Sequence, residues 1–247
     1  MFFYLYDNFL QDRKYHNDLN QIETRLANLG IQGRSEKITI LKNIPDATRL
    51  AIKRGADTVI AIGNDQTIVK LLPSVVETNT TLGLIPVGPH QTMAHVLGVP
   101  IGATACEVVS RRIVRRLDLG LVNSQYFLTS LEAPGTVIAA CDGKYNVTSL
   151  DQSGRISLMN FQNELSHGRP DDGVLELVIS PGHGHLAWRA FHRAQPGSVF
   201  TVKSVKFTSA GGPINMLLDG QITIKTPVIV KVAAKKLRVI VGKNRQF

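Results

Sequence analysis

The sequence has 247 residues, 43% of them hydrophobic, which is enough for one or two domains with a sizeable core. Its 28 Lys and Arg residues outnumber its 19 Asp and Glu residues, so the net charge is +9 and anionic partners are favoured. No apolar run approaches the roughly 18 residues of a membrane-spanning helix, and the apolar N-terminal stretch lacks the basic start of a signal peptide. We expect a cytoplasmic protein that meets a membrane only at its periphery.

The two cysteines, Cys106 and Cys141, lie in apolar surroundings and form no C-x-x-C motif. This pattern is typical of buried free thiols in a reducing compartment rather than of a disulfide framework or a zinc site.

The first part of the chain alternates short strand patterns with helical patterns. A helix that Asn17 or Asp18 can cap carries apolar residues at intervals of three and four residues and stops at Gly30. A second helix runs from Pro45 to Gly55, with Leu50 among the residues expected to face inward. This alternation predicts βαβ units and a parallel sheet. The other elements expected here are strands at 2–6, 37–41, 58–62 and 82–86, and helices at 66–77, 90–97 and 103–110.

From about residue 113 the pattern changes to short alternating runs separated by turn signals such as Asp142-Gly143 and Asp219-Gly220. We therefore expect an α/β domain with a parallel sheet over residues 1–112 and an antiparallel β-sandwich over 113–247, with the last strands able to return to the first domain. The segment 181–197 is expected to be a loop or a short helix. The expected strands are 113–117, 125–131, 135–141, 144–150, 155–161, 173–180, 199–209, 214–218, 221–224, 227–232 and 236–241.

Two strand–turn–helix patterns follow each other in the first domain. The β-branched strand 58–62 runs into Gly63 and then a helix, and the strand 82–86 runs into Gly88 and a second helix. Such turns are where open α/β sheets bind phosphates, so the two turns predict a single ligand cleft.

Four stretches of this sequence resemble the diacylglycerol kinase-type lipid kinases, whose nucleotide fold is shared with NAD kinases. They are GADTVIAIGNDQT, LGLIPVGPHQTMAHVLGVP, DDGVLEL from Asp171, and MLLDGQIT. Order and spacing agree with those of the family from about residue 38 to 241. The resemblance implies ATP-dependent phosphoryl transfer to a lipid hydroxyl at a membrane surface, with ATP and Mg²⁺ as cofactors. We rank this resemblance above a partial resemblance to NAD kinases. The two elements that resemble NAD kinase motifs are adjacent in this chain, whereas NAD kinases have a long separation between them.

The resemblance also assigns roles to particular residues. Asp65 becomes the acid that organises magnesium or phosphate, and Asp172 becomes part of a structural metal site, although an Asp-Gly hairpin turn explains Asp172 equally well. Asp219 is a catalytic candidate that could instead shape its turn. The nucleotide-binding candidates are Gly63, Asn64, Gln66, Thr67, Gly88, Pro89, His90 and Gln91.

Several of these residues depart from the family pattern in ways that bear on catalysis. Asn64 and Gln66 replace two glycines, which costs backbone freedom at positive φ, and Pro89 removes one N–H from the expected phosphate cradle. Gln221 stands where the family has the glutamate thought to act as base, and an amide cannot take a proton near neutral pH. The alternative is therefore a catalytically inactive relative that binds nucleotide, lipid or a protein partner. A kinase for a different small alcohol also stays open.

Other polar features are less specific. A metal site at His183 and His185 with His192 or His167 lacks helical spacing or a cysteine partner. The basic groups at 111–116 and 235–238 could meet phosphates or an anionic membrane, or could simply be charges on an edge strand. They lack the aromatic residues of RNA-binding modules, so we expect no nucleic-acid partner. A homodimer is compatible with the sequence.

Overall fold

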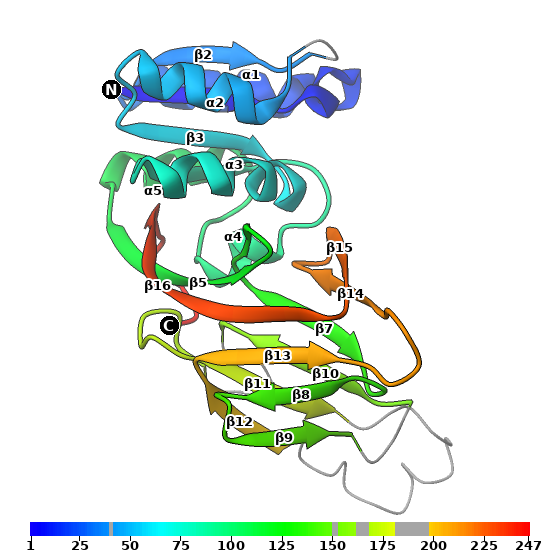
Figure 1. Cartoon of the computed structure of the whole chain (residues 1–247). Helices are drawn as coiled ribbons and strands as arrows, with labels where there is room; N and C mark the ends of the chain where they lie inside the picture. Colours follow the sequence, from blue (N-terminus) through cyan, green and yellow to red (C-terminus); the bar gives the residue numbers. More distant parts are fainter. Residues whose placement is uncertain (40–41, 150–152, 162–167, 181–197) are drawn as a thin grey trace, which may run out of the picture. The chain divides into compact units, whose positions relative to one another are not determined.

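The computed structural model describes residues 1–39, 42–149, 153–161, 168–180 and 198–247. The expected loop at 181–197 and its histidines, together with His167, lie outside the described residues. The chain divides into two compact units (Figure 1). Unit 1 comprises Met1–Leu117 and Lys236–Gln246, and unit 2 comprises Asp118–Lys235 with Phe247. In the described part of the chain, no helix is long and apolar enough to cross a membrane.

Unit 1 contains a parallel sheet in the order β2-β1-β3-β4-β16. Its strands β3 and β4 are buried along their whole length, and for β3 the β-branched run predicts this. Helices α2 and α3 pack together, and α1 packs with α5. The bounds are β1 Phe2–Tyr6, η1 Asn8–Gln11, η2 Arg13–Tyr15, α1 His16–Asn28, β2 Arg34–Lys37, α2 Ile44–Lys53, β3 Thr58–Gly63, α3 Asp65–Glu77, β4 Thr81–Pro86, α4 Thr92–Val96, η3 Gly102–Thr104 and α5 Ala105–Arg111.

The carboxyl ends of β1 and β3 lie side by side in this sheet, with Tyr6 in register with Ile62. The chain passes from β1 outward to β2 and then crosses to β3 on the other side of β1. Such a reversal of strand order is the position at which open α/β sheets place their ligand crevice. Asp7 follows β1 and Gly63 ends β3, so the first predicted turn lies at this reversal of strand order.

Three details of unit 1 differ from the sequence prediction. The second strand is Arg34–Lys37 instead of 37–41, because β1 sets its register and pairs Tyr6 with Lys37. Helix α1 starts at His16, so Asn17 and Asp18 lie inside it and neither caps it. Leu50 is 36% exposed rather than inward-facing, whereas Ala47 and Ala51 are buried.

Unit 2 is antiparallel. One sheet has the order β12-β11-β10-β7-β14-β15, and β13 pairs with β8 and with the first part of β16. Buried residues of both sheets, among them Phe207, Ile156 and Leu177, form one hydrophobic cluster, as expected for a sandwich. The bounds are β5 Val114–Val122, β6 Gln125–Phe127, β7 Ser130–Pro134, β8 Ile138–Cys141, β9 Tyr145–Thr148, β10 Arg155–Met159, β11 Leu175–Ser180, β12 Ser198–Val202, β13 Ser204–Thr208, β14 Asn215–Leu218, β15 Ile222–Lys225 and β16 Val228–Ile240.

Strand β16 is a single strand of 13 residues, whereas the sequence predicts two strands at 227–232 and 236–241. Its first part pairs with β13 in unit 2, and its last part pairs with β4 in unit 1. The last part of β16 is therefore a strand of the parallel sheet of unit 1. Both cysteines are buried and free, as predicted, and burial raises the pKa of the Cys106 thiol to about 11.

Candidate functional site

The first predicted turn is built around Asn64, which is the N-cap of α3. Its side-chain oxygen accepts hydrogen bonds from the N–H groups of Gln66 (3.1 Å) and Thr67 (3.4 Å), and its own N–H donates to Thr67 Oγ1 (3.1 Å). These bonds form a capping box. Asn64 has φ −123°, and Gln66 is not among the residues with positive φ. The predicted cost of losing glycine at these two positions is therefore not incurred.

Gly63 and Thr67 are packed against each other at the end of β3. A Cβ atom added at Gly63 would overlap the Thr67 hydroxyl, so the turn requires glycine there. That hydroxyl donates a hydrogen bond to Asp7 Oδ2 at 2.6 Å, and Asp7 is itself buried at the end of β1. The Thr67 side chain therefore ties the first turn to β1.

Asp65 connects the first turn to the second. Its side chain is buried, with 3% of the residue exposed, and its two oxygens accept the N–H groups of Thr92 (2.9 Å) and Met93 (3.1 Å). Its own N–H donates to the His90 carbonyl at 3.0 Å. The carboxylate thus satisfies backbone donors at the start of α4, where a negative charge is favourable.

In the second turn, the side chain of Gln91 fills the space between the two turns. Its Nε2 lies 2.9 Å from the Val87 carbonyl, 3.1 Å from that of Gly88 and 3.2 Å from that of Gly63. Its Oε1 is buried without a hydrogen-bond partner among the described residues. The Gln91 amide therefore binds backbone carbonyl groups of the protein itself.

Pro89 and His90 are exposed, and α4 begins only at Thr92. Pro89 therefore lies before the helix and not in its first turn. His90 has φ +60° and keeps an open side-chain environment. Of the two exposed residues in this turn, His90 is the one with a polar side chain.

The second turn is covered from the N-terminal part of the chain. A Cβ atom at Gly88, which has φ +87°, would lie 2.9 Å from Phe9 Cε2 and 3.4 Å from the Tyr15 hydroxyl. The two rings pack edge to face with centroids 5.4 Å apart. Phe9 therefore occupies the space beside Gly88, so a phosphate could approach this glycine only if the ring moved.

In unit 2, the carboxylate of Asp219 binds one short segment of backbone. Its oxygens accept the N–H groups of Leu128 (2.7 Å), Thr129 (2.7 Å) and Ser130 (3.0 Å), and also the Thr129 hydroxyl (2.6 Å). Burial raises the pKa of Asp219, while these hydrogen bonds act in the opposite direction. Asp219 is therefore a clamp on the segment between β6 and β7.

Gln221 lies beyond Gly220 in the same turn, where its N–H donates to the Leu218 carbonyl at 2.8 Å. The residue is partly exposed, so its amide can reach solvent. The turn thus keeps the shape that Asp219-Gly220 predicts, while the position of the family's base carries a group without basicity near neutral pH.

Asp118 is a polar centre that sequence reasoning missed. It is fully buried, and its carboxylate accepts the N–H groups of Gly173 and Lys235, both at 2.6 Å. Asn160 donates to the Asp118 and Leu128 carbonyls, both at 2.8 Å. The one signal in the sequence is an acid between the leucines of an alternating apolar strand.

Asp172 lies beside this centre. Burial raises its pKa, and the charges of Asp118 and Asp171 act in the same direction, while the Val174 N–H bound to its Oδ1 opposes them. The described residues contain no group of three or more His, Cys, Asp or Glu side chains arranged to hold a metal ion. The metal role of Asp172 stays a prediction, and the histidine site lies outside the described residues.

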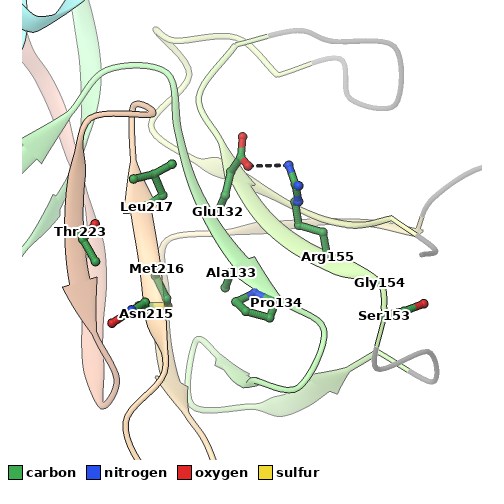
Figure 2. Close-up of a pocket in the computed structure, with 10 residues that line it drawn as sticks. All are labelled: Glu132, Ala133, Pro134, Ser153, Gly154, Arg155, Asn215, Met216, Leu217 and Thr223. Atoms are coloured by element: carbon green, nitrogen blue, oxygen red, sulfur yellow. Dashed lines mark hydrogen bonds and ion pairs between the residues drawn. The ribbon is translucent and has the colours of Figure 1, made fainter. Parts of the chain in front are cut away.

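Two surface hollows lie away from the predicted site residues. Figure 2 shows the hollow in unit 2, of about 450 Å³, with the Glu132–Arg155 ion pair (2.6 Å) on one side and Asn215, Met216 and Leu217 of β14 on the other. Strand β14 pairs with β7 only at Leu217 and Leu218, so the sheet opens beyond them. A hollow of about 480 Å³ in unit 1 lies between α4, α5 and the residues that follow β16.

Residues 5–122 match the sequence family described as the diacylglycerol kinase catalytic domain. This stretch, which is just under half of the chain, is similar to that family. It contains both predicted turns together with Asp65, Gly88 and Gln91, while Asp219 and Gln221 lie outside it.

Two curated relatives agree with this assignment. A diacylglycerol kinase of Bacillus subtilis (strain 168) is 30% identical over 118 residues, which is 46% of this chain and 39% of that protein. An uncharacterized protein of Synechocystis is 32% identical over 85 residues, 34% of this chain and 20% of that protein. The chain therefore matches well under half the length of either relative.

The fold is shared with solved structures. A diacylglycerol kinase structure from Bacillus anthracis str. Sterne has a TM-score of 0.79 and 18% identity, covering 98% of this chain and 97% of that one. A structure of a diacylglycerol kinase-like protein from the same organism also has a TM-score of 0.79, at 17% identity. At this identity the likeness concerns the fold, and it extends through both units.

Proposed function

We propose that this diacylglycerol kinase-like protein binds a ligand on the kinase scaffold and does not transfer phosphate. One observation carries the proposal. Asp65 and Asp219, the acids retained from the first and last family motifs, are both buried and both satisfy backbone N–H groups, and the position of the family's base is Gln221.

Phosphoryl transfer requires a carboxylate on the metal, donors around the phosphates and a group that takes the proton of the attacking hydroxyl. A glutamine at the base position removes a contribution of roughly 10²–10⁴ in rate. The Asp65 carboxylate would have to release Thr92 and Met93 before it could hold a metal in an open geometry. The contacts of Asp65 therefore stabilise the fold, and Gln221 does not provide the base that the reaction requires.

The direct test is an assay with radiolabelled ATP, magnesium and a mixture of diacylglycerols in detergent micelles. We expect no phosphatidic acid from the wild-type protein. We also expect none from Gln221→Glu, because Phe9 and Gln91 still fill the turns. Turnover by the wild-type protein that Asp65→Ala abolishes would overturn the proposal.

The alternative is an ATP-dependent lipid kinase, and the match of residues 5–122 to the catalytic domain family favours it. In that case ATP and Mg²⁺ are the cofactors, with His90 as the accessible polar side chain of the second turn. Thermal unfolding with millimolar ATP or ADP, with and without magnesium, separates the two. A magnesium-dependent rise in melting temperature that Pro89 and His90 variants change would support the kinase, since only a ligand of the folded state raises it.

A further inference from the structure

The positive charge of the chain is concentrated in one unit. Unit 1 contains 18 of the 28 Lys and Arg residues and 10 of the 19 Asp and Glu residues, so it carries eight of the nine net positive charges. In the sequence this excess looks evenly spread, because unit 1 includes the separate C-terminal segment Lys236–Gln246. Unit 1 is therefore the part of the chain whose net charge favours anions.

Within unit 1, the hollow between α4 and α5 is lined by two positive side chains, Arg111 of α5 and Lys243. His95 of α4 also lines it, and its volume is about 480 Å³. The one acid that lines it, Glu107, is bound to Arg25 at 2.6 Å and lies 3.8 Å from Arg111. Lys243 is exposed and forms no ion pair with any residue that the structure describes.

The hollow has a fixed floor. Gly98, with φ +69°, contacts the backbone of Asn244 and Arg245, and a Cβ atom at Gly242 would overlap the Gly98 carbonyl. The Gly242 N–H donates to the Leu97 carbonyl at 2.9 Å. Close backbone contact of this kind, possible only with glycine, holds Lys243 beside α4.

An apolar edge adjoins the positive lining. Pro100 lines the hollow and is exposed, and Ile101, the next residue, is 65% exposed, which exceeds any other exposed large hydrophobic residue in the described chain. Positive side chains next to an exposed apolar residue are the combination that binds at the boundary of headgroups and acyl chains.

We propose that this hollow binds the phosphate-bearing headgroups of an anionic lipid bilayer, with Ile101 entering the interface beside them. The inference deepens the ligand-binding part of the proposed function. It needs neither nucleotide nor phosphoryl transfer, so an assay without ATP or diacylglycerol tests it separately from catalysis.

The experiment is cosedimentation of the full chain with sucrose-loaded vesicles of phosphatidylcholine, with or without about a third phosphatidylserine. We expect binding to the anionic vesicles that falls steeply as salt rises from about 0.05 to 0.5 M. Lys243→Glu should lower the partition coefficient about tenfold or more, since each positive residue near such a surface contributes on the order of fivefold. Ile101→Ser should lower it at every salt concentration.

The matched control is Lys70→Glu, which makes the same charge change at an exposed position of unit 1 outside the hollow. It should retain most of the binding, and melting temperatures should confirm that all variants fold. Equal losses for Lys243→Glu and Lys70→Glu would overturn the site. So would equal binding to neutral vesicles, or complete competition by millimolar inorganic phosphate or by a short RNA, which would identify a soluble anion or a nucleic acid as the ligand.

Discussion

Asp65 in unit 1 and Asp219 in unit 2 come from family motifs and have a similar structural environment. Each is buried and each accepts hydrogen bonds from successive backbone N–H groups. They differ in what they hold. Asp65 caps a five-residue helix, whereas Asp219 holds a non-helical segment through three N–H groups and a hydroxyl. An acid retained from a catalytic motif can therefore remain because the fold needs it, and the two sites need it to different degrees.

The largest expected effect is that of Asp219→Ala. This change removes the acceptor of the N–H groups of Leu128, Thr129 and Ser130. Leu128 and Ser130 are buried, and each N–H group left buried without a partner costs about 1–3 kcal/mol. We expect the free energy of unfolding to fall by about 3–5 kcal/mol in urea denaturation. The control is Asp46→Ala, which removes a solvent-exposed ion pair with Arg49 on α2 and should leave the free energy of unfolding nearly unchanged.

Asp65→Ala should cost less, about 2 kcal/mol, because two backbone N–H groups, those of Thr92 and Met93, lose their acceptor. Asp65→Asn should recover part of this loss, since asparagine also caps helices. The same urea experiment measures both variants. If Asp65→Ala proves more destabilising than Asp219→Ala, the contrast between the two sites is wrong.

Gln91→Leu should reduce the free energy of unfolding by about 1–2 kcal/mol, because three carbonyl groups lose their shared donor while one buried, unpartnered oxygen is removed. Gln66→Leu, on the exposed face of α3, is the matched control and should have little effect. A gain in ATP binding by Gln91→Leu, measured by calorimetry, would indicate that this side chain alone closes the turns.

The smallest effect concerns pH and sharpens the role of Asp219. Because burial raises the pKa of Asp219 above its ordinary value of 3.8, the folded state binds this proton more strongly than the unfolded state. The contribution of this carboxyl to stability is then fully present below pH 3.8 and is lost as pH rises through the raised pKa.

The measurement is the difference in the free energy of unfolding between wild type and Asp219→Asn at several pH values above 3.8. The stability of the wild type relative to this variant should decrease as pH increases. Asp46 provides the opposite sign, since hydrogen bonds from Arg49 and Asn43 lower its pKa. The free energy of unfolding of the wild type, relative to that of Asp46→Asn, should decrease as pH falls below 3.8. A difference between wild type and Asp219→Asn that increases with pH would show that the hydrogen bonds outweigh burial at Asp219.

The parts of the fold that depend on local pattern could be predicted from the sequence. The β-branched runs give β3 and β4, and the change to alternating runs gives the antiparallel unit. The position of β2 could not be read in this way, because Ile38 and the residues after it alternate as a strand does, while pairing with β1 selects Arg34–Lys37. Predicting β16 as two strands fails for a similar reason, since one strand pairs with partners in both units.

The candidate site was predicted as a set of positions but not as a set of contacts. The turns at Gly63 and Gly88 occur where the sequence indicates. The covering of Gly88 by Phe9 and the binding of Gly173 and Lys235 to Asp118 arise from residues distant in the chain. No local propensity reports such contacts, and Phe9 in particular reads as an ordinary apolar residue.

The path of β16 has a consequence for the order in which the protein folds during synthesis. Strand β4 is complete at Pro86, yet its neighbour on one side is Arg238 and Val239, which the ribosome adds some 150 residues later. Until then unit 1 has an open edge at a fully buried strand, and such an edge can pair with another chain. The nascent protein should therefore be most prone to aggregation before Arg238 and Val239 emerge, and a chaperone that covers β4 would act during that interval.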